Sequence, residues 1–251
     1  FPIILKLKKL YNLPKNVPAN EFLNLEGKKL STSRNWAIWL HEYLEDFKNH
    51  KDAMRYALCS TAPESKDTDF TWKDFQARNN NELVAIYGNF INRVVVLTHK
   101  YWDGVIPEKH DLKNYDKEVL SSLCKYTEKI GDSIERYRFR EALQEFMNLA
   151  RLGNKYLADT EPWKLKKIDE NRTKTILNIS LQISASLSIL SEPFLPFSSR
   201  KLKNMLNISG LCWDDAKREN LHAGRSINKT NLLFTKIEDS EIEKQILKLN
   251  S

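Results

Sequence analysis

The longest regular pattern of apolar residues in this chain lies between residues 76 and 101. Apolar side chains recur there every three or four residues and form one stripe: Leu83, Ile86, Tyr87, Phe90, Ile91, Val94, Leu97 and Tyr101. This spacing predicts an amphipathic helix whose stripe faces the core. At 100° per residue, Asn89 falls on the opposite side, Arg93 lies about 40° from it, and Val96 should be exposed there too. Gly88 lies in mid-helix, where it costs roughly 1 kcal/mol relative to alanine; close approach of another backbone would explain it, and so would chance.

Helical spacing extends over most of the chain, which has only seven glycines. It predicts further helices at about 36–47, 51–59, 116–129, 133–157, 169–191, 197–206 and 236–249, with a helical turn after Thr71. Asn35 is the predicted N-cap of the first of these helices. Thr71 with Asp74, and Asp132 with Glu135, form predicted capping boxes. The predicted fold class is therefore mostly α.

The best strand signal lies at residues 22–30. Apolar residues lead into a Glu26-Gly27 turn and Lys29-Leu30 returns from it, which predicts a short β-hairpin. The polar runs 63–69 and 103–118 are predicted to be loops.

Composition narrows the class of protein. The chain has 251 residues, 41% hydrophobic and 29% charged, enough to bury a core. Its three cysteines and five histidines are scattered, so we expect no metal, no disulfide framework and a reducing cytosol. No run approaches the ~20 apolar residues of a membrane span, and we find no targeting segment. Since residue 1 is Phe and not Met, we expect a fragment or a processed product.

The net charge of +7 and the pI of about 9.1 favour a polyanionic partner. An ordinary basic cytosolic protein would have the same charge. The lysines and arginines gather in short runs at 6–9, 164–167 and 200–203, however, and this clustering favours contacts with phosphates.

Residues 26–34 read Glu-Gly-Lys-Lys-Leu-Ser-Thr-Ser-Arg. A mobile loop of lysine and serine can neutralise the phosphates of a nucleotide during phosphoryl or adenylyl transfer. Lys29, Ser31 and Ser33 are the candidate catalytic residues. No long α/β domain precedes this loop, so if it is catalytic, most of the catalytic domain lies outside this chain. The alternative is a lysine-rich hairpin tip of the kind common on protein surfaces.

Asn89, Arg93 and Trp163 are the candidate RNA-binding residues. Asn and Arg match base edges with paired hydrogen bonds, which are worth about 1–3 kcal/mol of discrimination each. Trp163 follows Glu161-Pro162, a pair that suits the start of a helix. A tryptophan can stack on an unpaired base, which is worth about 1–3 kcal/mol. The alternatives are a solvated helix face for Asn89 and Arg93, and a core anchor for Trp163.

Five motifs in order resemble one known family. Lys29-Leu-Ser-Thr-Ser33 is similar to the KMSKS loop of class I aminoacyl-tRNA synthetases. Ala62-Pro-Glu-Ser-Lys-Asp-Thr-Asp-Phe-Thr-Trp72 resembles the stem-contact region that follows the Rossmann domain in the methionyl-tRNA synthetases. Residues 80–93 resemble the first anticodon-domain helix, and Tyr156-Leu-Ala-Asp-Thr-Glu-Pro-Trp163 and Pro193-Phe-Leu-Pro196 resemble later landmarks. The resemblance covers nearly the whole chain and is to the C-terminal half of the bacterial enzymes.

The resemblance implies a division of the chain into four parts. Residues 1–34 would be the end of a Rossmann-type catalytic domain, with the hairpin and the KMSKS-like loop. Residues 35–79 would be the stem-contact region, and 80–225 a helical-bundle anticodon-binding domain. Residues 226–251 would be a C-terminal helical segment that packs back on the body.

The resemblance also implies roles for the RNA-binding residues. In that family an Asn and an Arg on this helix, with a Trp after the Glu-Pro pair, recognise the CAU anticodon of tRNA(Met). By position these roles fall on Asn89, Arg93 and Trp163. Unpaired loop bases are what sequence-specific RNA readers recognise, by stacking and by hydrogen bonds to their edges.

The KMSKS-like loop departs from the family pattern at two positions. Leu30 replaces methionine, and Thr32 replaces the second lysine, which removes a charge. In the family these lysines stabilise the transition state of adenylation by ATP. That role would fall on Lys29, helped by Lys28 or Arg34, and Thr32 is given none.

The parent enzyme implied by the resemblance joins methionine to tRNA through methionyl-adenylate made from ATP. Its HIGH motif, methionine pocket and zinc-binding insertion lie upstream in the family and are not in this chain, nor is the C-terminal appended domain that some members have. We therefore expect the chain to bind the CAU anticodon without catalysing the reaction, and to be a monomer in the cytoplasm, without a metal or a membrane contact.

Three alternatives stay open at this point. One is another class I synthetase with a similar helical domain, such as that for valine, leucine, isoleucine or cysteine. The second is a stand-alone helical RNA-binding or scaffold module without catalysis. The third is a helical protein-interaction domain whose basic charge is incidental, which would bind its partner without sensitivity to salt.

Overall fold

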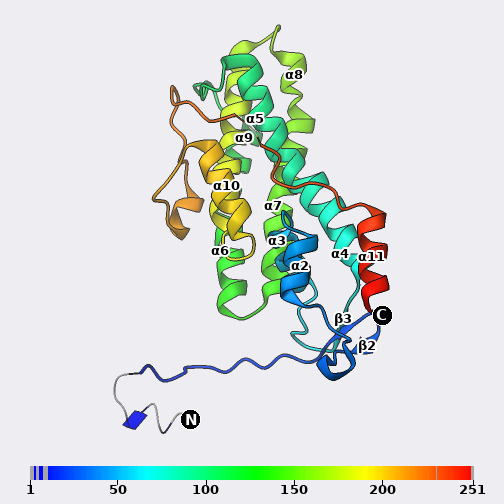
Figure 1. Cartoon of the computed structure of the whole chain (residues 1–251). Helices are drawn as coiled ribbons and strands as arrows, with labels where there is room; N and C mark the ends of the chain where they lie inside the picture. Colours follow the sequence, from blue (N-terminus) through cyan, green and yellow to red (C-terminus); the bar gives the residue numbers. More distant parts are fainter. Residues whose placement is uncertain (1–2, 4–5, 8–10, 230, 250–251) are drawn as a thin grey trace.

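A computed structural model describes residues 3, 6–7, 11–229 and 231–249. The predicted class is confirmed, because helices make up most of the described chain and a small sheet lies at one end of the bundle (Figure 1). The elements are β1 Leu23–Leu25, β2 Lys28–Lys29, η1 Thr32–Arg34, α2 Leu40–Asp46, α3 Lys51–Ser60, β3 Thr68–Phe70, α4 Trp72–Arg78, η2 Asn79–Gly88, α5 Asn89–Trp102, α6 Asn114–Glu135, α7 Phe139–Thr160, α8 Pro162–Leu165, α9 Glu170–Leu190, α10 Pro196–Leu206, η3 Trp213–Lys217 and α11 Asp239–Leu249.

The sheet has the order β2-β1-β3. The predicted hairpin is confirmed, since β1 and β2 pair antiparallel through Asn24–Lys29 and Leu25–Lys28. The prediction that 63–69 is entirely loop is wrong, because β3 begins at Thr68 and pairs parallel to β1. A strand this short carries no periodicity of its own, and its partner lies more than forty residues earlier in the chain.

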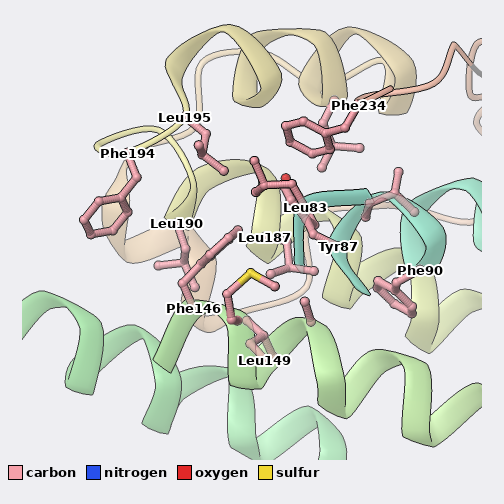
Figure 2. Packing of buried hydrophobic residues seen from close by; sticks show 14 of the residues in the cluster. Leu83, Tyr87, Phe90, Phe146, Leu149, Leu187, Leu190, Phe194, Leu195 and Phe234 are labelled. Carbon is pink, nitrogen blue, oxygen red and sulfur yellow. The ribbon is translucent and has the colours of Figure 1, made fainter. Parts of the chain in front are cut away.

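Helix α9 lies at the centre of the bundle, and every residue from Thr175 to Leu190 is buried. Figure 2 shows Leu187 and Leu190 of this helix among aromatic residues from four other segments: Tyr87 of η2, Phe90 of α5, Phe146 of α7, and Phe194 of the turn before α10. The helix begins as predicted, because the carboxylate of Asp169 accepts the N–H of Arg172 at 2.8 Å. It ends before the Pro193–Pro196 run, as predicted.

The helix predicted over 76–101 is present as three consecutive segments, α4, η2 and α5. Its middle segment, η2, is π-helical, which the apolar spacing alone does not reveal. A side chain at Gly88 would meet the ring of Phe234 at 3.4 Å and the carbonyl oxygen of Leu83 at 3.0 Å. The close neighbours of Gly88 are therefore the Leu83 carbonyl of its own helical rod and the Phe234 ring, which also packs on Tyr87 (Figure 2), and not the backbone of another element.

The predicted cap at Asn35 is wrong, and the helix after it is shorter than predicted. The backbones of Ser31 and Trp36 bond to each other at 2.9 and 3.0 Å, which closes residues 31–36 into a tight loop. Asn35 adopts a left-handed conformation with φ 53° at the end of η1, and α2 begins only at Leu40. The Asn35 side chain instead accepts the indole N–H of Trp39 at 2.8 Å.

The predicted break at Asp132 is also wrong, because α6 continues to Glu135. The Asp132–Glu135 pair therefore lies inside α6 and does not cap a new helix. Gly131, just before it, lies against the indole of Trp213, where an added Cβ would lie 3.3 Å from Nε1. By contrast, the Thr71 cap is confirmed, because its hydroxyl accepts the Asp74 N–H at 3.1 Å.

A buried ion pair joins α6, α7 and α9. Asp116 on α6 is fully buried and binds the guanidinium of Arg172, with Nη2 to Oδ1 at 2.9 Å and a second bond from Nη1 to Oδ2. The Tyr156 hydroxyl donates to Oδ1 at 2.7 Å, and the Lys113 N–H donates to Oδ2 at 2.8 Å. Burial alone would raise the pKa of Asp116, but these bonds outweigh it and hold the pKa below its usual value.

The Asp116→Asn variant should lose about 3–5 kcal/mol of unfolding free energy, because the buried Arg172 charge is left without its partner. Since the pKa of Asp116 is lower in the folded than in the unfolded state, its contribution is present above about pH 4 and is lost as the pH falls below it. Denaturant titrations of wild type and variant between about pH 7 and pH 2 measure both effects. The control is Asp214→Asn at an exposed pair with Lys217, with an expected loss of about 0–1 kcal/mol. Equal losses in the two variants would contradict the prediction.

Candidate nucleic-acid interface

Helices α5 and α8 carry the three predicted RNA-binding residues. Asn89 is the first residue of α5 and is exposed, and Arg93 follows one turn later. Trp163 is the second residue of α8 and is 38% exposed. The guanidinium carbon of Arg93 lies 5.0 Å from the centroid of the Trp163 ring, within the range of a cation–π contact. The structure thus brings Arg93 and Trp163 into contact and places Asn89 one turn away on the same helix.

The exposed indole of Trp163 does not behave as a core anchor, in contrast to Trp72, which is 1% exposed. Pro162 holds the first position of α8, as predicted, and Glu161 before it adopts a left-handed conformation with φ 40°. The Glu161 carboxylate also pairs with Lys164 at 2.7 Å. The sharp turn between α7 and α8 therefore sets the direction of the ring. Val96 is 41% exposed on α5, which confirms the predicted polar side of that helix.

Asn154 on α7 is a part of this interface that the sequence did not predict. Its Oδ1 accepts from the side chain of Asn89 at 3.4 Å, and its own amide donates to the carbonyls of Ile86 at 2.9 Å and Ala150 at 3.2 Å. The bond to Ile86 ties α7 to η2 directly below Asn89. One signal was available in the sequence, namely Gly153 next to it, since a glycine inside a helix often marks a close approach.

The lysines after Trp163 are only partly free. Lys166 pairs with Glu170 at 2.7 Å and lies 4.6 Å above the ring of Trp102, so its charge serves the packing of α8 on α5 and α9. Lys164 pairs with Glu161. Lys167 is exposed and has no carboxylate within 4.0 Å in the described part of the chain. It is the member of this run best placed for a phosphate contact.

The KMSKS-like loop lies with the small sheet at the end of the molecule opposite to α8 (Figure 1). The ammonium of Lys28 lies 4.4 Å above the Trp36 ring, whereas that of Lys29 lies 5.7 Å from the exposed ring of Phe22. The hydroxyls of Ser31 and Ser33 are 3.2 Å apart. Neither lysine has a carboxylate within 4.0 Å among the described residues, so Lys29 presents a positive charge that no acidic side chain neutralises.

The base of this loop is fixed by charged hydrogen bonds. The Gly27 N–H donates to both carboxylate oxygens of Asp69 at 2.9 Å. The Glu26 carboxylate accepts the N–H of Trp72 at 2.8 Å, and the Trp36 indole donates to the Leu25 carbonyl at 2.9 Å. These bonds hold the two ends of the loop while Ser31 to Ser33 lie at its exposed tip.

Two other kinds of feature, a metal centre and a membrane-spanning helix, are absent from the described residues. No three His, Cys, Asp or Glu side chains there lie together as metal ligands would. None of the helices in that part of the chain is long and apolar enough to cross a membrane.

Comparison with known proteins decides the family. Residues 106–250 match the anticodon binding domain of methionyl tRNA ligase, and residues 1–95 match the class I (M) tRNA synthetases. The chain belongs to the methionyl-tRNA synthetase family. The resemblance seen in the five motifs is thereby confirmed.

Two similar relatives are both methionine–tRNA ligases. That of Christiangramia forsetii is 61% identical over 259 residues, which cover 100% of this chain and 38% of the relative. That of Cytophaga hutchinsonii is 62% identical over 250 residues, which cover 99% of this chain and 36% of the relative. The chain therefore spans little more than a third of the length of these relatives.

The fold is that of solved synthetases. Mycobacterium tuberculosis methionyl-tRNA synthetase in complex with methionyl-adenylate superposes with a TM-score of 0.82 at 22% identity, covering 90% of this chain and 45% of that one. The apo form of the same enzyme gives a TM-score of 0.80 at 21% identity, with the same coverage. At this level of identity the likeness shows the fold alone.

Asp69→Ala should loosen the base of the KMSKS-like loop, because Gly27 loses its charged acceptor. We expect the Gly27 amide proton to exchange with solvent at least about tenfold faster, since hydrogen bonds to charged groups contribute roughly 1.5–3 kcal/mol. Hydrogen exchange followed by NMR measures it. The matched control is Asp67→Ala, because Asp67 accepts the N–H of Phe22 outside the turn. Unchanged exchange at Gly27 in the Asp69 variant would contradict the assigned role.

Gly153→Ala should push α7 away from α5, because a Cβ at this position would lie 2.6–2.8 Å from ring atoms of the buried Phe90. We expect a loss of about 1–3 kcal/mol of unfolding free energy, as in other overpacked cores. The control is Gly131→Ala, where the new Cβ meets Trp213 at 3.3 Å and helix propensity gains about 1 kcal/mol. Thermal or urea unfolding distinguishes them, and a Gly153 variant as stable as the Gly131 variant would refute this account of the α5–α7 contact.

Proposed function

We propose that this chain is the anticodon-binding part of a methionine–tRNA ligase and that it recognises the CAU anticodon of tRNA(Met). The observation that carries the proposal is the Arg93 guanidinium on the exposed Trp163 ring, one helical turn from Asn89. An aromatic platform beside two side chains that bond base edges is what reading of an unpaired RNA loop requires. The family match to the anticodon-binding domain supports the same role.

The chemistry of recognition follows from the three side chains. An anticodon base that leaves the stack can lie on the free face of Trp163, and the planar Arg93 already contacts that ring. The Arg93 guanidinium and the Asn89 amide then offer donors and an acceptor to the base edges. Asn154 holds the Asn89 amide in place through the 3.4 Å bond, which favours one orientation before RNA arrives.

The activity proposed for the whole enzyme is the attachment of methionine to tRNA through methionyl-adenylate, with ATP as the second substrate. Lys29, Ser31 and Ser33 would contact the ATP phosphates, and no role is given to Thr32. The unneutralised charge of Lys29 at an exposed loop tip supports this role, because developing phosphate charge needs a free cation. The chain alone should not catalyse, since the rest of the active site would come from outside it.

The division at residues 34, 79 and 225 belongs to this proposal, as do a monomeric state and action in the cytoplasm. The C-terminal segment is held against the stem-contact region by Asp46, which accepts from Lys244 at 3.0 Å and Gln245 at 2.8 Å. A zinc ion would belong to the upstream insertion that the family carries outside this chain.

A binding titration tests the proposal. A labelled anticodon stem-loop with CAU is compared with one changed at the first anticodon base, at two salt concentrations. We expect a preference for CAU that persists at the higher salt, since base contacts are less sensitive to salt than phosphate contacts. Trp163→Ala should weaken binding roughly tenfold or more, and Arg93→Ala should reduce the preference for CAU.

The matched control is Trp39→Ala, which removes an equally exposed tryptophan (36%, against 38% for Trp163) near the KMSKS-like loop. It should leave affinity and preference unchanged. Equal, salt-sensitive binding of both RNAs would leave only a basic helical surface. Unchanged affinity in the Trp163 and Arg93 variants would refute the site.

A further inference from the structure

A groove of about 450 Å³ lies between α3, α7 and the α4–η2 rod, and its polar lining is rich in arginine. Helix α7 contributes Arg140, Gln144, Asn148 and Arg151 from one of its faces, and Arg78 lies across from them. We call this the α7 groove. Leu143 and Met147 form its buried floor, so its rim offers charge and amides in place of apolar anchors.

The acidic residue that lines the groove, Glu82, does not neutralise the positive charge of Arg140 and Arg151. Glu82 accepts from the Tyr56 hydroxyl and lies 4.0 Å from Arg78, which also pairs with Asp74 at 2.6 Å. Arg78 is therefore satisfied within the protein.

Arg140 and Arg151 differ from Arg78 in this respect. Both are exposed, and neither guanidinium has a carboxylate within 4.0 Å in the described part of the chain. Among the described residues, the Arg151 guanidinium donates to the amide oxygen of Asn148 at 3.1 Å. The Glu64 carboxylate accepts the backbone N–H of Arg140 at 2.9 Å, and this bond does not involve the Arg140 guanidinium. Two guanidinium groups thus remain for an outside anion.

The α7 groove leads to the anticodon-reading residues. Along α7, the face that carries Arg140, Gln144, Asn148 and Arg151 continues one turn further to Asn154, a span of about 21 Å at 1.5 Å per residue. Asn154 contacts Asn89, so the last residue of this polar stripe touches the first reading residue. At its other end the groove reaches Ser60, next to the segment 62–72.

We infer that the α7 groove binds the phosphate backbone of the RNA stem that presents the anticodon loop, through Arg140 and Arg151. This inference rests on the proposed function and deepens it. Unpaired guanidiniums flanked by amide donors suit phosphate oxygens, which accept two parallel N–H bonds from one arginine. An acidic peptide would need apolar anchors as well, and the groove offers none at its rim. Phosphate contacts fix the position of the RNA, and the reading residues then meet the bases.

The test uses this chain with the CAU stem-loop and the one-base variant, titrated over several salt concentrations. Arg140→Ala and Arg151→Ala should each weaken binding roughly three- to tenfold, by the same factor for both RNAs. Each should also lower the slope of log affinity against log salt by about one. Arg225→Ala, an exposed arginine in the loop after η3, outside the groove and outside the basic runs, is the matched control and should leave the slope unchanged. Arg151→Lys should restore most of the slope. Thermal unfolding checks that each variant is folded.

The outcomes separate this inference from the proposed function. If wild type prefers CAU but the Arg140 and Arg151 variants behave like the Arg225 variant, the groove assignment fails and the reading site stands. If both variants lower the salt slope while wild type shows no preference for CAU, the groove stands and base reading fails. If the Arg140 variant loses the preference for CAU instead of affinity for both RNAs, the groove is not a phosphate site. No binding of either RNA by wild type overturns both.

Discussion

The burial of α9 on all sides from Thr175 to Leu190 is the constraint on which the rest of this structure depends. A helix enclosed on all sides must satisfy its polar side chains within the protein, because an unpaired buried group costs several kcal/mol. Gln182 shows how this works: its oxygen accepts the N–H groups of Asn220 and Leu221 at 2.9 and 3.0 Å, and its amide donates to the Leu221 carbonyl at 2.7 Å. Ser180 and Ser184 instead return their hydroxyls to the helix backbone. The polar residues of α9 therefore also position the segments that surround it.

This arrangement extends to the interface through α7 and α5, which both pack on α9. The Asp116–Arg172 pair fixes α6 to α9, and Tyr156 adds α7 to the same network. Three residues before Tyr156, Gly153 allows the Phe90 ring to lie against the α7 backbone. The contact between Asn154 and Asn89 is thus a consequence of how the helices pack in the core.

The sequence predicted the parts of this fold that depend on local pattern. The helical spacing of apolar residues predicted that Asn89 and Arg93 face away from the core. The preference of proline for the first position of a helix predicted that Trp163 lies at a helix start, and there its ring contacts Arg93. Two of the missed features depend on partners distant in sequence: β3 pairs with β1, and Asn154 bonds to η2. Asn35 does not cap a helix because it belongs to the 31–36 turn, where its backbone N–H donates to the Thr32 carbonyl. The residue types in this segment did not predict that turn. The roles of the site residues came from the family resemblance and remain predictions.

The α4–η2–α5 rod has one more consequence. Its first residue, Trp72, is bonded to Glu26 at the base of the KMSKS-like loop, and its last turns carry Arg93 and then Trp102 beside α8. A single run of helix therefore connects the base of the KMSKS-like loop to the contact between α5 and α8. Because a π-helix has more residues in each turn than an α-helix, η2 changes the direction in which the side chains of α5 point relative to those of α4. The directions of Asn89 and Arg93, in the first turns after η2, therefore depend on how this preceding segment is wound.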